Sequence, residues 1–279
     1  MHAAVSRFAI WIASHTFDPE RNHALLRLLL AAFEAGDSAE GGSPLSLLQH
    51  VLSVSTRGSA TIGGASFVAS KFDAAAARLA CPLGATLAEL GAEGATTLWS
   101  AMLLRARVCV YHSGGVAPLL ALVRCLPLLV WHRGRWEGAL RGLCCASEEE
   151  LAVLQAAGSL AAGFVDPAIL ERPQLYDVII DAREGKGGGQ SISVKLTPSG
   201  SSLCPPAAVA REVAKALEAV PPAASTQEVV EALSAKTSEL LAKAEEVALQ
   251  TGSDEAGLPE GVAAFLRRLH EAEGLGAGA

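Results

Sequence analysis

Residues 98–136 (LWSAMLLRARVCVYHSGGVAPLLALVRCLPLLVWHRGRW) constrain the fold more than any other stretch of the chain. Apolar residues recur at helical spacing from Leu98, and residues 108–111 form a short β-branched and aromatic run that is typical of a strand. A Ser-Gly-Gly turn follows, and then an apolar helical stretch at residues 116–125 that we expect Pro127 to end.

Residues 128–131 are apolar again and bounded by charge, which predicts a second buried strand. A strand that is apolar on both faces is normally covered by helices on both sides. The stretch therefore predicts the centre of an α/β layer, and α/β is the fold class that we expect for the body of the chain.

The flanking sequence predicts further elements around this centre. We expect strands at residues 7–14, 161–165 and 176–181. We expect helices from Pro19, from Pro44 and from Glu148, the last behind a Ser147 cap.

Details of two segments near the N-terminus are also predictable. The helix from Pro44 carries apolar residues that we expect to face inward, namely Leu45, Leu47, Leu48, Val51 and Leu52. We expect a loop at residues 56–65 and either a short strand or a packed loop at residues 67–72.

The last third of the chain has a different character. A glycine-rich break at residues 185–189 is followed by Ala-rich segments that predict an all-helical tail, at residues 207–220, 226–250 and 258–273.

Composition and charge exclude several classes of protein. Hydrophobic residues make up 51% and charged residues 18% of the chain, which is enough for a sizeable core. The net charge is −7 without a basic cluster, so we expect neither nucleic acid nor an anionic membrane surface as a direct partner. No apolar run reaches about 18 residues, and the first residues are poorly flanked for a signal peptide, so we expect no membrane insertion.

The six cysteines include no C-x-x-C pair, which indicates a reducing compartment. Cys109 and Cys125 lie in apolar stretches, and this favours buried thiols over a redox role.

No motif for covalent chemistry stands out. The glycines at 185–189 lack P-loop spacing, which favours a flexible linker over a phosphate-binding loop, and Gly91 and Gly94 favour a bend between helices. His112 and His132 follow predicted strands, but no acid or nucleophile lies at a characteristic spacing, so a structural role is favoured for both. The sequence therefore indicates no catalytic group, metal site or cofactor.

Trp131, His132, Arg133, Arg135 and Trp136 form a polar and aromatic patch. Aromatic residues and arginine are frequent anchors of protein interfaces, so one interpretation is a docking site for a partner protein. The alternative, which these residues favour by themselves, is a strand end capped by packed indole rings.

Several motifs of the chain resemble the DENN-domain family. In chain order they are a helix-to-strand segment at 102–111, Leu-Pro at 126–127, a tryptophan-containing segment at 131–136, GFVD at 163–166 and YDVIID at 176–181. FDPER at 17–21 and RPQLYDV at 172–178 extend the resemblance, which weakens after Gly185.

The resemblance implies a DENN-type central α/β module between a partial longin-like lobe and an all-α C-terminal module. We assign residues 1–60 to the longin-like lobe, 61–184 to the central module, 185–205 to a Gly/Pro/Ser linker and 206–279 to the helical module. Residues 7–58 resemble only the last strand and final two helices of the family's longin-like lobe, so we expect the first part of that lobe to be missing.

The resemblance also implies a guanine-nucleotide exchange factor for a Rab-type small GTPase. Such a protein would be cytoplasmic, peripheral on late endosomes and active in late endosomal or secretory trafficking. Exchange needs no covalent step, because it depends on binding the nucleotide-free GTPase more tightly than the loaded one. The alternative is a non-enzymatic scaffold subunit of an endosomal recycling (Commander-type) assembly that binds coiled-coil partners.

The family supplies no single catalytic residue that can be transferred to this chain. The resemblance and the aromatic patch together give these candidates for contact with a partner: Trp131, His132, Arg133, Arg135, Trp136, Arg172 and Tyr176.

Overall fold

A computed structural model describes residues 19–35, 43–133, 139–184, 190–221, 224–249, 258–259 and 261–274. The chain divides into two compact units, Met1–Arg78 and Leu79–Ala279. The strand predicted at residues 7–14 lies outside the described residues.

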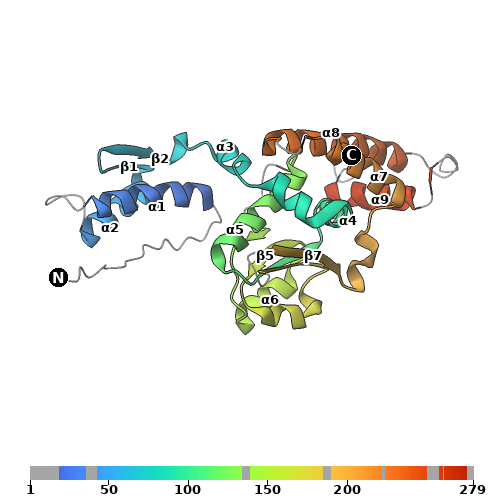
Figure 1. Ribbon diagram of the computed structural model, residues 1–279, viewed down its shortest axis with the longest axis horizontal. Coiled ribbons are helices and arrows are strands. Elements are labelled where there is room, and N and C mark those ends of the chain that lie inside the picture. The colour runs from blue at the N-terminus through green and yellow to red at the C-terminus, as the bar shows by residue number, and fades with distance from the viewer. Residues whose placement is uncertain are drawn as a thin grey trace. The chain divides into compact units, whose positions relative to one another are not determined.

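The first unit packs two helices against a β-hairpin (Figure 1). Its elements are α1 (Pro19–Glu34), α2 (Pro44–Arg57), β1 (Ser59–Ile62), β2 (Ala65–Val68), η1 (Ala69–Lys71) and the start of α3 (Ala74–Leu79). Ser43 caps α2 by accepting the Ser46 N–H at 3.1 Å, and α2 ends at Gly58, whose φ is +73°. Gly63 and Gly64 both have positive φ, as the tight turn between β1 and β2 requires.

Two predictions for this unit are wrong. The expected loop at residues 56–65 contains β1, since Ala60 and Ile62 are buried against α1. In α2, Leu47 and Val51 pack on the core as predicted, but Leu45, Leu48 and Leu52 are each more than half exposed. A helix on a small hairpin buries only one face, and these three leucines lie outside it.

The second unit is built on a five-stranded sheet with the order β4-β5-β3-β6-β7. The strands are β3 (Arg107–His112), β4 (Leu140–Arg141), β5 (Leu160–Phe164), β6 (Val178–Glu184) and β7 (Gln190–Leu196). All pairings are parallel except that of β6 with β7. The predicted strands at 108–111, 161–165 and 176–181 are confirmed, and β3 lies at the centre.

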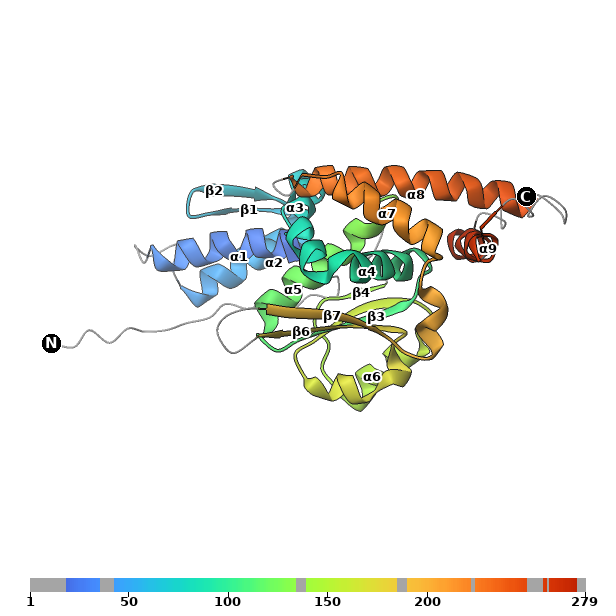
Figure 2. The ribbon, with the colours of Figure 1, turned by 45° about the vertical axis from the view of Figure 1, so that its right-hand side comes forward.

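Helices cover both faces of this sheet, which confirms the predicted α/β layer (Figure 2). Gly163 of β5 lies against Leu119 and Val123 of α5 (Val116–Cys125), whereas Phe164 packs in one cluster with Leu151 of α6 (Glu148–Ala156). Successive strand residues point to opposite faces, so the two helices lie on opposite sides. Helix α4 (Leu83–Leu103) packs against β7 and contacts α5.

The second strand predicted in the central stretch is wrong. Residues 126–130 form a 3-10 helix, η2 (Leu126–Val130), that continues directly from α5 and is buried throughout. Pro127 fits the first turn of η2, where its missing N–H breaks no hydrogen bond. A short apolar run has no periodicity that separates a buried strand from a buried helix, and tertiary packing selects the helix here.

The predicted linker at 185–205 contains a strand and a helical turn. β7 pairs with β6 over its whole length, and η5 (Ser199–Leu203) follows it. This strand has a local signal in the sequence, because Ile192 and Val194 alternate with Ser191 and Ser193. The prediction of a linker did not take that alternation into account. The glycines at 185–189 lie outside the described residues.

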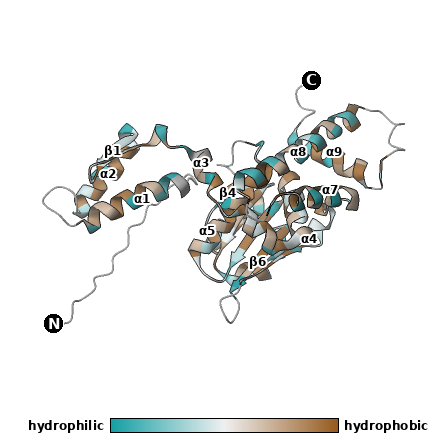
Figure 3. Cartoon of the chain, turned by 45° about the horizontal axis from the view of Figure 1, so that its top comes forward, coloured by the Kyte–Doolittle hydropathy of each residue, from teal (hydrophilic) through white to brown (hydrophobic). Residues whose placement is uncertain are grey.

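The helical tail is confirmed as α7 (Ala207–Glu218), α8 (Thr226–Leu249) and α9 (Val262–Glu273). α7 and α8 pack against α4 and against each other, and α9 packs on α8. Figure 3 shows hydrophilic and hydrophobic residues alternating along α8 and α9, as expected of helices with one buried face. Among the described residues, no helix is long and apolar enough to cross a membrane. The assignment of these parts to DENN modules remains a prediction.

Candidate partner-binding site

The structure places five of the seven predicted partner-binding residues. Trp131, His132 and Arg133 directly follow η2. Arg172 lies between η3 (Pro167–Glu171) and η4 (Pro173–Leu175), and Tyr176 follows η4 just before β6. Arg135 and Trp136 lie outside the described residues.

Arg133 caps the C-terminal end of α4. Its Nη1 donates to the carbonyl of Met102 at 2.7 Å, and its Nη2 donates to that of Leu103 at 2.5 Å. The last carbonyls of a helix have no partner within the helix, and a cation there also interacts favourably with the helix dipole. Arg133 therefore adds a side-chain cap to a helix end that is also closed by backbone hydrogen bonds, from the Arg105 N–H to Met102 and from the Ala106 N–H to Ala101.

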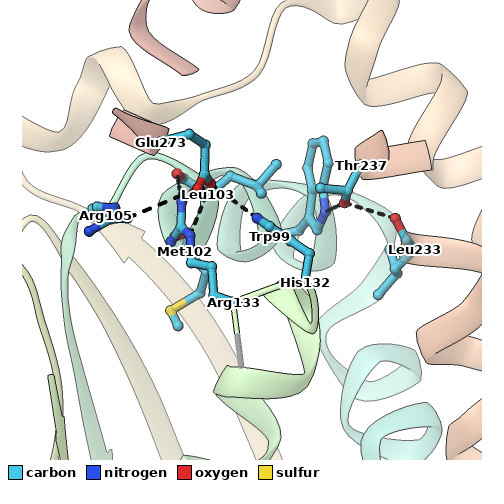
Figure 4. A network of polar contacts seen from close by, with 9 residues as sticks. All are labelled: Trp99, Met102, Leu103, Arg105, His132, Arg133, Leu233, Thr237 and Glu273. Carbon is cyan, nitrogen blue, oxygen red and sulfur yellow. Dashed lines mark hydrogen bonds and ion pairs between the residues drawn. The ribbon is translucent and has the colours of Figure 1, made fainter. Parts of the chain in front are cut away.

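The same guanidinium binds Glu273 at the end of α9 (Figure 4). Arg133 Nε donates to Glu273 Oε1 at 2.9 Å, and Nη2 contacts the same oxygen. His132 Nε2 lies 3.1 Å from that oxygen, and Arg105 Nη2 lies 4.0 Å from Oε2. The side chain of Arg133 is 11% exposed and that of Glu273 is 9% exposed, so water has little access to this ion pair.

The electrostatics of Glu273 reflect this arrangement. Burial alone would raise the pKa of the Glu273 carboxyl, but hydrogen bonds from His132 and Arg133, together with their charge, lower it to about 2. Glu273 is therefore ionised across the physiological range.

A second contact fixes α8 to α4 in the same region. The fully buried Trp99 donates its indole N–H to Thr237 Oγ1 at 3.3 Å, and the Thr237 hydroxyl donates to the carbonyl of Leu233 at 2.8 Å (Figure 4). The helical module thus contacts the body through this indole hydrogen bond and the ion-pair cluster, and also through a hydrogen bond from Thr226 Oγ1 to the carbonyl of Cys81 at 2.5 Å.

Arg107 and Asp177 form a bidentate ion pair at the amino-terminal ends of β3 and β6. Arg107 Nη2 donates to Asp177 Oδ1 at 2.8 Å, and Arg107 Nε donates to Oδ2 at 3.2 Å. The backbone N–H of Arg107 also donates to Oδ2, and Ser199 Oγ donates to Oδ1. Burial opposes ionisation of Asp177, but the hydrogen bonds from Arg107 and Ser199 and the charge of Arg107 outweigh it and lower the pKa of Asp177.

Tyr176 and Arg172 differ in accessibility. Tyr176 is only 4% exposed, and its hydroxyl donates to the carbonyl of Leu170 at 3.4 Å, so its ring belongs to the core beneath α6. Arg172 is partly exposed. Among the described residues, no hydrogen bond or ion pair joins Arg172 or Tyr176 to the group at 131–133.

A further polar cluster lies toward the carboxyl ends of the parallel strands. Asp181 is buried on β6 and accepts from Arg183 at 2.8 Å and from Lys195 at 2.8 Å. Burial opposes ionisation of Asp181, but these two cations lower its pKa. Nearby, the buried His112 accepts the Gly114 N–H at Nδ1, which fits the structural role predicted for it.

Sequence reasoning missed Glu273, Thr237 and Asp177. Each acts through a partner that is distant in the chain, so no local spacing signals it. The described residues contain no group of three or more His, Cys, Asp or Glu side chains arranged to hold a metal ion. Trp131 and Arg172 are partly exposed, whereas Arg133 is largely buried against Glu273, and the role of these residues in binding a partner remains a prediction.

Comparison with curated proteins gives several related sequences. DENN domain-containing protein 10 of Homo sapiens is 32% identical over 183 residues, which is 65% of this chain and 49% of the human protein. Proteins of the same name in Danio rerio and Dictyostelium discoideum are each 32% identical, over 178 and 179 residues. Over the matched residues, this chain is therefore similar to proteins named DENN domain-containing protein 10.

This chain spans about half the length of its DENN domain-containing protein 10 relatives, and the share is 46% for the Dictyostelium discoideum protein. It matches no protein-family model. The resemblance of the motifs to the DENN-domain family is thus confirmed by relatives from animals and an amoeba.

Proposed function

We propose that this chain is a guanine-nucleotide exchange factor for a Rab-type small GTPase in late endosomal or secretory trafficking, acting in the cytoplasm at the surface of late endosomes. The observation that carries the proposal is its homology with DENN domain-containing protein 10 over 183 residues.

The proposed mechanism is differential binding. A protein that binds the nucleotide-free GTPase more tightly than the loaded one stabilises the empty state and so accelerates nucleotide release. A rigid binding surface favours this, because little conformational entropy is lost on association. Trp131 and Arg172 are partly exposed, and each lies within a few residues of an ion pair in the chain, Arg133 with Glu273 and Arg107 with Asp177.

The test is a nucleotide-release assay with a panel of Rab proteins loaded with a fluorescent GDP analogue. We expect the chain to accelerate release from one Rab or a small group of Rabs. We also expect it to bind that Rab more tightly in EDTA, which chelates magnesium and so promotes loss of the nucleotide, than in magnesium with GTP. Equal affinity for the empty and loaded GTPase would rule out the proposal.

A second candidate function is a scaffold subunit of an endosomal recycling assembly that binds coiled-coil partners. The helical module favours it, because α7, α8 and α9 present a long helical surface fixed to the body through Glu273 and Thr237. This function predicts coiled-coil partners that are recovered equally with EDTA and with magnesium and GTP. Recovery of no coiled-coil protein under either condition would exclude it.

A further inference from the structure

The outer edge of β7 takes no part in the contacts described above. β7 is the last strand in the order β4-β5-β3-β6-β7, and among the described residues it pairs with β6 alone. Its seven residues span about 23 Å, whereas the strand at the opposite edge, β4, has two residues. Figure 2 shows β7 beside β6 at the border of the sheet.

The direction of the backbone groups along β7 follows from two hydrogen bonds. The Thr197 N–H donates to the Asp177 carbonyl at 3.0 Å, so the odd-numbered residues of 191–195 exchange hydrogen bonds with β6. The Ser113 N–H donates to the Ala182 carbonyl at 3.0 Å, which places the even-numbered residues of β6 toward β3. The two bonds agree on one alternation along both strands.

Ile192, Val194 and Leu196 therefore direct their N–H and C=O groups away from β6. Within the part of the chain that the structure describes, no hydrogen bond involves these outward groups. A row of unpaired main-chain donors and acceptors at a sheet edge is a template for another extended chain.

β7 lacks the features that commonly block such an edge. Its sequence, QSISVKL, contains no proline, and its register with β6 runs without a bulge. Lys195 is its one charged residue, and the Lys195 ammonium lies 2.8 Å from Asp181 Oδ2 on β6. This lysine therefore leans back over the sheet and does not cover the outer edge.

The two faces of β7 indicate which side chains an added strand would carry. Ile192, Val194 and Leu196 are partly exposed on the face toward α4, where a Cβ at Gly94 would lie 3.6 Å from Val194 Cγ2. Residues directly opposite each other on neighbouring strands point to the same face, with their Cβ atoms about 5 Å apart. Apolar side chains on an added strand would thus extend the layer beneath α4.

The opposite face of β6 and β7 is cationic. Arg183 and Lys195 both bind Asp181, and their side chains are each 58% exposed. One carboxylate cannot neutralise two cations, so this face favours acidic side chains on a neighbouring strand.

We propose that β7 binds an extended segment of a partner protein as a further strand, in which β-branched apolar side chains alternate with acidic ones. The segment's backbone pairs with the outward groups of Ile192, Val194 and Leu196, and its acids face Lys195 and Arg183. In strand addition of this kind, main-chain hydrogen bonds supply affinity and alternate side chains supply specificity. Strand addition at β7 requires no exchange activity, so the two functions can fail separately.

The test uses the full chain and a fluorescent peptide of alternating valine and glutamate, about as long as β7. A matched peptide of alternating valine and lysine controls for charge. Two further valine and glutamate peptides carry N-methyl groups, one on its valines and the other on its glutamates. N-methylation removes an N–H and keeps the order of side chains, so only the set of residues whose N–H groups face β7 should be sensitive to it.

Ile192→Pro makes the matching change in the protein. It removes an outward N–H and leaves the hydrogen bonds to β6 in place, because proline is tolerated at such a position of an edge strand. Ile192→Ala, its control, shortens the side chain but keeps the N–H. If thermal unfolding shows that Ile192→Pro is not folded, the two N-methylated peptides test the same hydrogen bonds on the unmodified chain.

We expect saturable binding of the valine and glutamate peptide, measured by fluorescence anisotropy. Affinity should be about fivefold lower for the valine and lysine peptide and about tenfold lower in Ile192→Pro, but should change less than about threefold in Ile192→Ala. One N-methylated peptide should bind like its parent and the other should not bind. Hydrogen exchange at the amides of Ile192, Val194 and Leu196 should slow when the parent peptide is bound.

Several results would overturn the inference. Absence of saturable binding, or equal affinity of the two N-methylated peptides, would exclude strand addition. Unchanged hydrogen exchange at the three outward amides would exclude β7 as the binding site, and equal affinity of the glutamate and lysine peptides would exclude an acidic segment. A dimer of the unmodified chain that Ile192→Pro converts to a folded monomer would identify a second copy of this chain, and not a partner protein, as the occupant.

Discussion

Arg133 and Glu273 are 140 positions apart in the chain, yet Arg133 Nε donates to Glu273 Oε1 at 2.9 Å. The same guanidinium holds the last carbonyls of α4, so one side chain joins the central helix of the body to the last helix of the tail. Two residues of the aromatic and basic patch, His132 and Arg133, therefore bind the last helix of the chain and stabilise its position on the body.

Removal of the Glu273 charge should destabilise the fold. Glu273→Gln leaves the Arg133 charge largely buried without a counter-ion, and we expect a loss of about 2–4 kcal/mol in the free energy of unfolding. Chemical denaturation followed by circular dichroism measures it. Glu271→Gln, at an exposed position on the same helix, should change stability by less than about 0.5 kcal/mol. An equal loss of stability in Glu273→Gln and Glu271→Gln would contradict the role of Glu273 as the counter-ion of Arg133.

The same ion pair predicts a pH dependence. The pKa of Glu273 falls from its ordinary value of 4.5 to about 2 in the folded chain. A carboxyl with a depressed folded pKa stabilises the fold above its unfolded pKa, and this contribution is lost as the pH falls from about 4.5 to about 2. The unmodified chain should therefore lose more stability over that window than Glu273→Gln. Parallel curves for the two proteins would show that Glu273 is not the titrating group.

Asp177→Asn should destabilise the sheet at the amino-terminal ends of β3 and β6. The substitution keeps the shape but removes the charge that holds Arg107 Nε and Nη2, and we expect a loss of about 1–3 kcal/mol. Hydrogen exchange should also accelerate at the start of β6. Glu171→Gln, an exposed neighbour, serves as the control and should leave both measurements unchanged.

Two glycine substitutions should have opposite effects. A Cβ at Gly163 would lie 2.3 Å from the carbonyl oxygen of Gly142 and 2.9 Å from Val123 Cγ2, so Gly163→Ala should cost about 2 kcal/mol or more. At Gly84, inside α4, the nearest atom is Val229 Cγ2 at 3.7 Å, and Gly84→Ala should stabilise the chain by about 0.5–1 kcal/mol. Thermal unfolding distinguishes the two, and a stabilised Gly163→Ala would refute the packing described at β5.

Arg172→Ala tests the proposed GTPase surface. Arg172 is partly exposed, so its loss should leave stability within about 0.5 kcal/mol. If it contacts the GTPase, affinity for the nucleotide-free Rab should fall about tenfold, measured by surface plasmon resonance. Lys243→Ala, an exposed cation on α8, should leave affinity unchanged. If the Arg172→Ala variant binds the nucleotide-free Rab as tightly as the unmodified chain does, Arg172 is not part of the binding site.

The sequence by itself determined the elements whose signals are local. β3 follows from a β-branched run, α6 from a Ser147 cap with acids behind it, and the helical tail from its alanine-rich segments. In these places, residues within one or two turns of each other supply the stabilising contacts, so their spacing is informative.

Tertiary structure alone decided the rest. η2 is a helix and not a strand because its apolar residues fill the space beside α4, and no periodicity in five residues records that choice. The roles of Arg133 and Asp177 depend on partners 140 and 70 positions away. An ion pair across such a separation forms only after the chain has folded, because folding brings the two charges together in a site that water barely reaches.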